Sequence, residues 1–177
     1  LKKCYVHWIK VKELISAGMW NSISRLSQVL SDGLDLVITN IWISAYLMGE
    51  LSIAQQIPTY ISTLTNTLIN LFSPNLTMYY AKDDTEAVVK ELKLSMKFSS
   101  FFVNIIFCIL VIFGKYFMQL WVPNQDVNLI YSLLVVIMMS LLVSGVTTSL
   151  NNVFLVTNRL KVNSIFWLII SFTNVLL

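Results

Sequence analysis

The chain has 177 residues, of which 56% are hydrophobic and 12% charged, with a mean hydropathy of +0.74 and a formal net charge of +3. A soluble domain usually carries about 25% charged residues, and so few charges could not cover a soluble surface. The charges lie between long apolar stretches, which is typical of a membrane protein, and the basic residues flank these stretches rather than forming a nucleic-acid-binding patch.

Five apolar stretches predict an all-α, polytopic membrane helix bundle in a single domain spanning residues 1–177. The first, second and fourth exceed the roughly 20 residues that cross a hydrocarbon core, so we expect them to tilt, bend or extend beyond the bilayer. The fifth is too short for a complete span, and the chain begins at Leu1 without an initiator Met, so we expect an internal segment of a longer transporter. The stretches cover residues 14–44, 51–81, 97–122, 127–157 and, truncated, 163–177.

Basic residues predict the orientation of these spans. The segments before the first, after the second and after the fourth span hold 10 of them, whereas the other two loops hold only Lys115. Cytoplasmic loops are enriched in Lys and Arg, so the pattern predicts a cytoplasmic N-terminus. The 10 residues are Lys2, Lys3, Lys10, Lys12, Lys82, Lys90, Lys93, Lys97, Arg159 and Lys161.

Residues 84–97 predict a short cytoplasmic surface helix before the third span. Acidic residues come first and lysines last, which matches the helix dipole. Val88, Val89, Leu92 and Met96 form an apolar face that suits a membrane surface. A solvated connecting helix fits the same residues.

Polar residues repeat at helical spacing within three spans. In the first span six of them fall within about ±40° of one line and climb roughly 27 Å at 1.5 Å per residue. Lipid cannot satisfy such a stripe, so it must face other helices or water; interhelical hydrogen bonding and a hydrated cavity are both open. The stripes are Asn21, Arg25, Gln28, Asp32, Asp35 and Thr39; Thr59, Thr63, Asn66, Asn70, Ser73 and Thr77; and, more weakly, Ser140, Ser144, Thr147 and Asn151.

Three ionisable residues in the first stripe favour a functional cavity. Placing a charge at the centre of a membrane helix costs at least about 2.5–3.5 kcal/mol, so such residues are usually paired or functional. Asp32 and Asp35 are neighbours on one helix face, and two ionised carboxylates this close repel each other. One of them could therefore exchange a proton or bind Na⁺ in a cation-coupled carrier. The alternative is that Arg25 and the two aspartates only hold neighbouring helices together.

Pro58 and Pro74 both lie in the second span, where each removes a backbone hydrogen bond and is expected to bend the helix. A bent helix suits a hinge in alternating access, and a static kink fits equally. Catalytic motifs and metal-ligand clusters are absent, so we expect neither an enzyme nor a cofactor. The one histidine, His7, precedes the first span, and Cys4 and Cys108 give no disulfide framework.

The segments Gly18–Gln28 and Gly33–Asn40 resemble the start of the second half of bacterial polysaccharide flippases. Met48–Ala54, Ile57–Thr59 and Phe72–Thr77 extend the resemblance, which covers about Leu14 to Lys161. These flippases belong to the multidrug/oligosaccharidyl-lipid/polysaccharide exporter superfamily and share the fold of the MATE drug exporters. The resemblance implies two pseudo-symmetric lobes around a central cavity, with this chain forming most of the second lobe.

The resemblance also implies a function, which is to flip undecaprenyl-pyrophosphate-linked oligosaccharides across the membrane for surface polysaccharide biosynthesis. The lipid-linked oligosaccharide, the bilayer and polysaccharide polymerase machinery would then be partners. Arg25 suits an anionic pyrophosphate, and amide side chains suit sugar hydroxyls. Asp32 stands where a small or apolar residue is expected. The implied cavity residues are Asn21, Arg25, Gln28, Asp32, Asp35, Asn66 and Asn70.

Two other functions remain open. A cation-coupled drug or metabolite exporter of the same fold would depend more on Asp32 or Asp35 than on Arg25. A membrane assembly subunit that transports nothing would lose stability, but no flux, when all three charged residues are neutralised.

Overall fold

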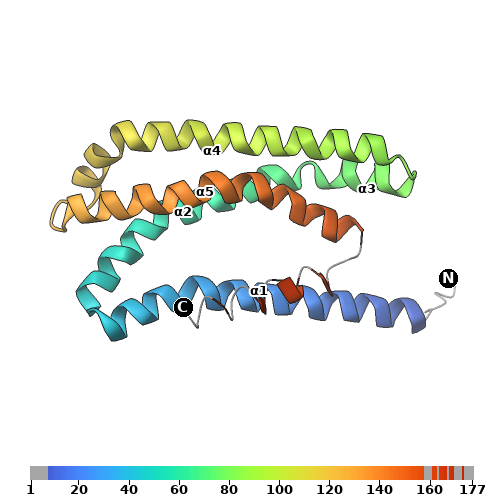
Figure 1. Ribbon diagram of the computed structural model, residues 1–177, viewed down its shortest axis with the longest axis horizontal. Helices are drawn as coiled ribbons and strands as arrows, with labels where there is room; N and C mark the ends of the chain where they lie inside the picture. Colours follow the sequence, from blue (N-terminus) through green and yellow to red (C-terminus); the bar gives the residue numbers. More distant parts are fainter. Residues whose placement is uncertain (1–7, 158–160, 163, 167, 170–172, 174–177) are drawn as a thin grey trace, which may run out of the picture.

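The described part of the chain is helical and contains no strand. A computed structural model describes residues 8–157, 161–162, 164–166, 168–169 and 173, so most of the fifth predicted span and His7 lie outside the described residues. Figure 1 shows α4 and α5 lying side by side along α2, with α1 diverging from them. The helices are α1 (Trp8–Trp42), α2 (Ala45–Asn70), α3 (Ser73–Ala81), α4 (Thr85–Trp121) and α5 (Val127–Val156).

Short polar side chains fix where three helices begin. Ser44 precedes α2 and accepts a hydrogen bond from the Leu47 amide at 3.1 Å, and Asp84 accepts one from the Ala87 amide at 2.9 Å before α4. Asp126 does the same for α5, because its Oδ1 accepts from the amides of Asn128 and Leu129, both at 3.1 Å. Such caps satisfy amides that have no partner inside the helix.

The second predicted span forms two helices rather than one. The chain breaks at Leu71 and Phe72, and Pro74 then falls in the first turn of α3, where its missing N–H is no loss. Pro74 therefore does not bend a helix interior. Pro58 lies buried inside α2, and Figure 1 shows α2 turning within its length to follow α5.

The predicted surface helix and the third span form one continuous helix of 37 residues, α4. The chain does not turn near Lys97, so the surface helix is not a separate element. At the start of α4 a hydrogen bond of 2.9 Å from the Asn75 amide group to Glu91 Oε1 joins α3 to α4.

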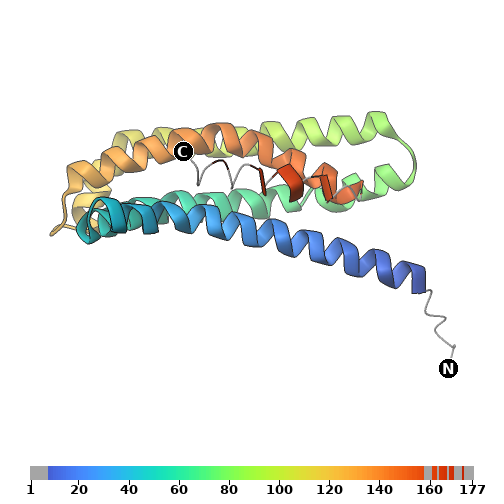
Figure 2. The ribbon, with the colours of Figure 1, turned by 60° about the horizontal axis from the view of Figure 1, so that its bottom comes forward.

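The apolar core lies between α2, α4 and α5, and half of its buried side chains come from α5. Among the five helices α1 packs only against α2 (Figure 2). A short described piece near the C-terminus also reaches α1, because the Ser164 hydroxyl donates to the Trp20 carbonyl at 2.8 Å. The buried core residues are Ala54, Ile61, Met118, Ile130, Leu134 and Met138.

Within the part of the chain that the structure describes, two helices are long and apolar enough to cross a membrane. They are Thr85–Trp121, with a mean hydropathy of 2.2, and Val127–Phe154, with 2.5. Most of their apolar side chains lie outside the core, where they suit contact with lipid or further helices. The helices α1 and α2 do not reach this hydropathy in the described residues, since they carry the two strongest polar stripes.

We expect Gly145→Leu to weaken the packing of α4 against α5. A Cβ at Gly145 would lie 3.1 Å from Val103 Cγ2, so a larger side chain would force the two helices apart, at a cost of about 1–3 kcal/mol. Thermal unfolding of the solubilised full-length protein measures the effect. Val143→Leu, at a 70% exposed position of the same helix, is the control and should leave the midpoint unchanged. Equal midpoints for both variants would contradict this packing.

Candidate functional site

The predicted cavity residues of α1 lie on a face that the described chain leaves uncovered. Asn21, Arg25 and Asp35 are all exposed, and neither Arg25 nor Asp35 forms an ion pair within the described residues. Gln28 and Asp32 also belong to α1, but their side chains lie outside the described residues. Arg25 is therefore free to bind a group that this part of the chain does not supply.

The contacts of α1 with the C-terminal piece lie on another side of the helix. The Trp20 carbonyl accepts the hydrogen bond from Ser164, and the Trp20 ring lies 5.7 Å from the Lys161 Nζ. At 100° per residue, Trp20 and buried Ser27 stand about 100–120° from the centre of the polar stripe. The stripe is thus not the surface by which α1 packs on this piece.

The polar stripe of α2 also faces away from the bundle. At 100° per residue its centre stands about 140° from the buried face of α2 that includes Ile61 and Thr65. The hydroxyls of Thr59 and Thr63 donate to the carbonyls four residues before them, at 2.7 and 2.9 Å. Asn66 and Asn70 are exposed, so their amide groups are open to other partners.

The weaker stripe of α5 follows the same pattern. Ser140, Ser144 and Thr147 are exposed, and their hydroxyls donate to carbonyls of α5 itself. Among the described residues, no hydrogen bond or ion pair joins the α1 stripe to the α2 stripe. Interhelical hydrogen bonding within this part of the chain therefore does not account for these stripes, and the structure leaves them as open polar faces.

A different set of polar residues makes the interhelical contacts. Ser95 of α4 and Ser149 of α5 form a buried hydrogen bond of 3.2 Å, and the Asn152 amide group donates to the Ile69 carbonyl of α2 at 3.4 Å. These residues do not belong to the predicted polar stripes. The four-residue spacing of Ser95 and Ser99 is the small-residue pattern of helix–helix contacts and could have identified the first pair.

A buried carboxylate lies where α2 meets the start of α5. Glu50 is 1% exposed, and its Oε1 accepts a hydrogen bond of 3.1 Å from the Asp126 amide. The interaction with the Glu50 side chain raises the pKa of Tyr46, one turn earlier in α2, above its ordinary value. By sequence, Glu50 lies in the loop between the first two predicted spans, and no pattern there predicts a role for it.

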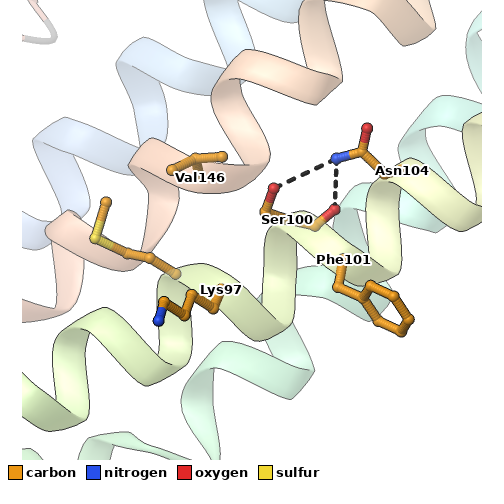
Figure 3. A pocket seen from close by; sticks show the side chains of 6 residues that line it. Lys97, Ser100, Phe101, Asn104 and Val146 are labelled. Carbon is orange, nitrogen blue, oxygen red and sulfur yellow. Dashed lines mark hydrogen bonds between the residues drawn. The ribbon is translucent and has the colours of Figure 1, made fainter.

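An open groove of about 460 Å³ separates α4 from α5 near the start of the third predicted span. In Figure 3 the side chains of Lys97, Ser100 and Asn104 follow α4, and Val146 faces them from α5. The Asn104 amide group donates to the Ser100 carbonyl at 2.8 Å and to its hydroxyl at 3.3 Å. Lys97 is the one charged residue of the lining, and Met96, Phe101 and Val146 make most of it apolar.

The chain is similar to a bacterial membrane protein. It is 26% identical over 166 residues to the uncharacterized membrane protein EpsK of Bacillus subtilis (strain 168). The aligned region covers 94% of this chain and 33% of EpsK. The chain thus spans about a third of the length of this curated relative. No protein-family model and no solved structure matches this chain. The similarity and the two long apolar helices support a membrane location.

Proposed function

We propose that this chain is part of a flippase that moves lipid-linked oligosaccharides from the cytoplasmic to the outer leaflet by alternating access. The observation that carries the proposal is the pair of polar faces on α1 and α2 that the described residues leave uncovered, one of which holds Arg25, a residue with no ion pair among the described residues. Side chains buried against the bundle could not serve a substrate, whereas these faces stay free for a cavity shared with the rest of a longer protein. The MATE-like fold and the inner-membrane orientation belong to the same proposal.

The residue types on these faces suit the two parts of such a substrate. A pyrophosphate is anionic, and a guanidinium can bind it through two parallel hydrogen bonds. The exposed amide groups of Asn21, Asn66 and Asn70 can both donate to and accept from sugar hydroxyls. If Arg25 faces a polar cavity and not lipid, the free-energy cost of placing its charge in hydrocarbon is also avoided.

Translocation by the purified full-length protein tests the proposal. We expect proteoliposomes to move a short-chain prenyl-pyrophosphate oligosaccharide from one leaflet to the other, so that an added lectin or glycosidase reaches it from the far side. Liposomes with an unrelated polytopic protein give the background rate. A rate equal to this background for correctly inserted protein would overturn the flippase proposal. A rate above background for a fluorescent cationic drug alone would favour the exporter instead.

A further inference from the structure

The charges of α4 relate the groove between α4 and α5 to a membrane boundary. Residues 98–114 hold no charged side chain and span roughly 26 Å at 1.5 Å per residue, which approaches the roughly 30 Å thickness of a hydrocarbon core. Lys97 and Lys115 flank this stretch, and both side chains are exposed. Lysines at the ends of a membrane helix extend toward the lipid head groups, so Lys97 brings a cation to the level of the lipid phosphates.

Three lysines of α4 share one face of the helix, and this face points away from the rest of the bundle. At 100° per residue, Lys90, Lys93 and Lys97 fall within about 60° of one another. The centre of this lysine face stands about 150° from the buried face of α4 that runs from Ser95 to Val103. All three lysines are exposed, and none forms an ion pair within the part of the chain that the structure describes.

The acidic residues of α4 do not neutralise Lys97. Glu86 lies on the lysine face, but it stands roughly 17 Å along the helix axis from Lys97, which is beyond the Debye length of about 8–10 Å at ordinary ionic strength. Glu91 lies on another side of α4 and accepts the hydrogen bond of 2.9 Å from the Asn75 amide group. The positive charge nearest the groove is therefore open to an anion from outside the described residues.

The groove beside Lys97 is mostly apolar and carries one further hydrogen-bond donor. The Asn104 amide group donates to the Ser100 hydroxyl oxygen at 3.3 Å, so the hydroxyl keeps its own proton for another acceptor (Figure 3). The volume of about 460 Å³ suits a head group and the adjoining part of an acyl chain, not a whole lipid. The apolar lining consists of Met96, Phe101 and Val146.

The combination of an unpaired cation and an apolar lining selects an amphiphilic ligand with an anionic head. A soluble anion gains nothing from the apolar side chains, and an apolar helix gains nothing from unpaired lysines. A bilayer phospholipid satisfies both parts of the groove, and it can enter laterally because the lysine face lies on the outside of the bundle. Basic pockets between membrane helices are known to bind anionic lipid head groups.

We propose that the groove between α4 and α5 binds an anionic glycerophospholipid of the bilayer. Lys97 and the Ser100 hydroxyl bind its phosphate, and an acyl chain lies along Phe101 and Val146. Lys90 and Lys93 add attraction for the anionic membrane surface around the site. The polar faces of α1 and α2 take no part, so the site is independent of the proposed flippase function.

Native mass spectrometry of the full-length protein in detergent tests the selectivity, with phosphatidylglycerol as the anionic probe and phosphatidylcholine as the neutral one. We expect tighter binding of phosphatidylglycerol, and Lys97→Gln should weaken it about fivefold, as expected when one lysine no longer attracts an anionic lipid. Lys115→Gln, at the other end of the uncharged stretch of α4, is the matched control and should retain the affinity. Equal binding of the two lipids, or equal effects of the two substitutions, overturns the proposal.

Photo-crosslinking locates the bound lipid in the wild-type protein. A phosphatidylglycerol with a photoactivatable acyl chain, incorporated with the full-length protein into nanodiscs, should label residues 96–104 of α4 or the neighbourhood of Val146. Val146→Trp fills the apolar part of the groove without changing any charge, so it should lower this labelling. Labelling confined to other segments, or unchanged by Val146→Trp, overturns the groove as the site.

Two competitors separate a bilayer lipid from the other sources of a phosphate group. A short polyprenyl pyrophosphate in amounts below those of phosphatidylglycerol, and inorganic phosphate at constant ionic strength, should both leave the labelling unchanged. Displacement by the first would assign the groove to a lipid-linked substrate, and displacement by the second to a soluble anion; either result overturns the proposal. Since no oligosaccharide is present, absent flipping activity would leave the lipid site standing.

Discussion

Arg25→Ala in the full-length protein is expected to trap lipid-linked oligosaccharide on the cytoplasmic leaflet. Hydrogen bonds to a charged group are worth about 1.5–3 kcal/mol, which corresponds to a fall of roughly tenfold to a hundredfold in delivery to the outer leaflet. The effect is large because Arg25 is exposed and unpaired within the described residues, so no other contact of the chain compensates for its loss. Labelling of surface oligosaccharide in intact cells, with protein amount measured in parallel, gives the rate.

Two further variants separate substrate binding from helix packing. Arg25→Lys keeps the charge but not the planar fork of donors, so it should restore only part of the delivery. Val29→Ala removes a 68% exposed apolar side chain one turn further along α1 and should leave delivery unchanged. Normal delivery by Arg25→Ala would contradict the role of Arg25 in head-group binding. A larger loss for Asp35→Asn, accompanied by lost drug efflux, would support the cation-coupled exporter.

Leu134→Ala should lower the free energy of unfolding more than truncation of an exposed side chain on the same helix does. Leu134 is fully buried between α5 and its neighbours, and truncating such a side chain costs about 2–5 kcal/mol. Lipid is as apolar as leucine, so the loss comes mainly from the cavity and the missing van der Waals contacts, which favours the lower part of that range. Unfolding of the solubilised full-length protein in increasing denaturing detergent measures it.

The matched control for Leu134→Ala is Val136→Ala, two residues further along α5 and 66% exposed. It removes a comparable side chain from the outer face of the same helix, so its effect should be small. Similar losses for both variants would mean that the core between α2, α4 and α5 does not hold these helices together.

Several features could be predicted from the sequence because they depend on local periodicity. Residues 127–157 predict one helix, and α5 covers Val127–Val156. Residues three and four apart share a face of any α-helix, so the stripe of α1 and the part of the second stripe in α2 each follow one helix face, whereas Ser73 and Thr77 fall in α3. The break before α3 was missed, because Pro74 fits both a kink inside a helix and the first turn of a new one.

The amino-acid sequence by itself determined that the chain is helical, rich in apolar residues and divided into alternately polar and apolar faces. Only the tertiary structure decided which polar groups lie inside. Glu50 and Asp126 are 76 positions apart, and Ser95 and Ser149 are 54 apart, so no local pattern reports their contact. The physical reason is that periodicity fixes the face on which a side chain lies, whereas burial depends on which other helix packs against that face. No described helix packs against the polar stripes of α1 and α2, whereas the start of α5 packs against Glu50.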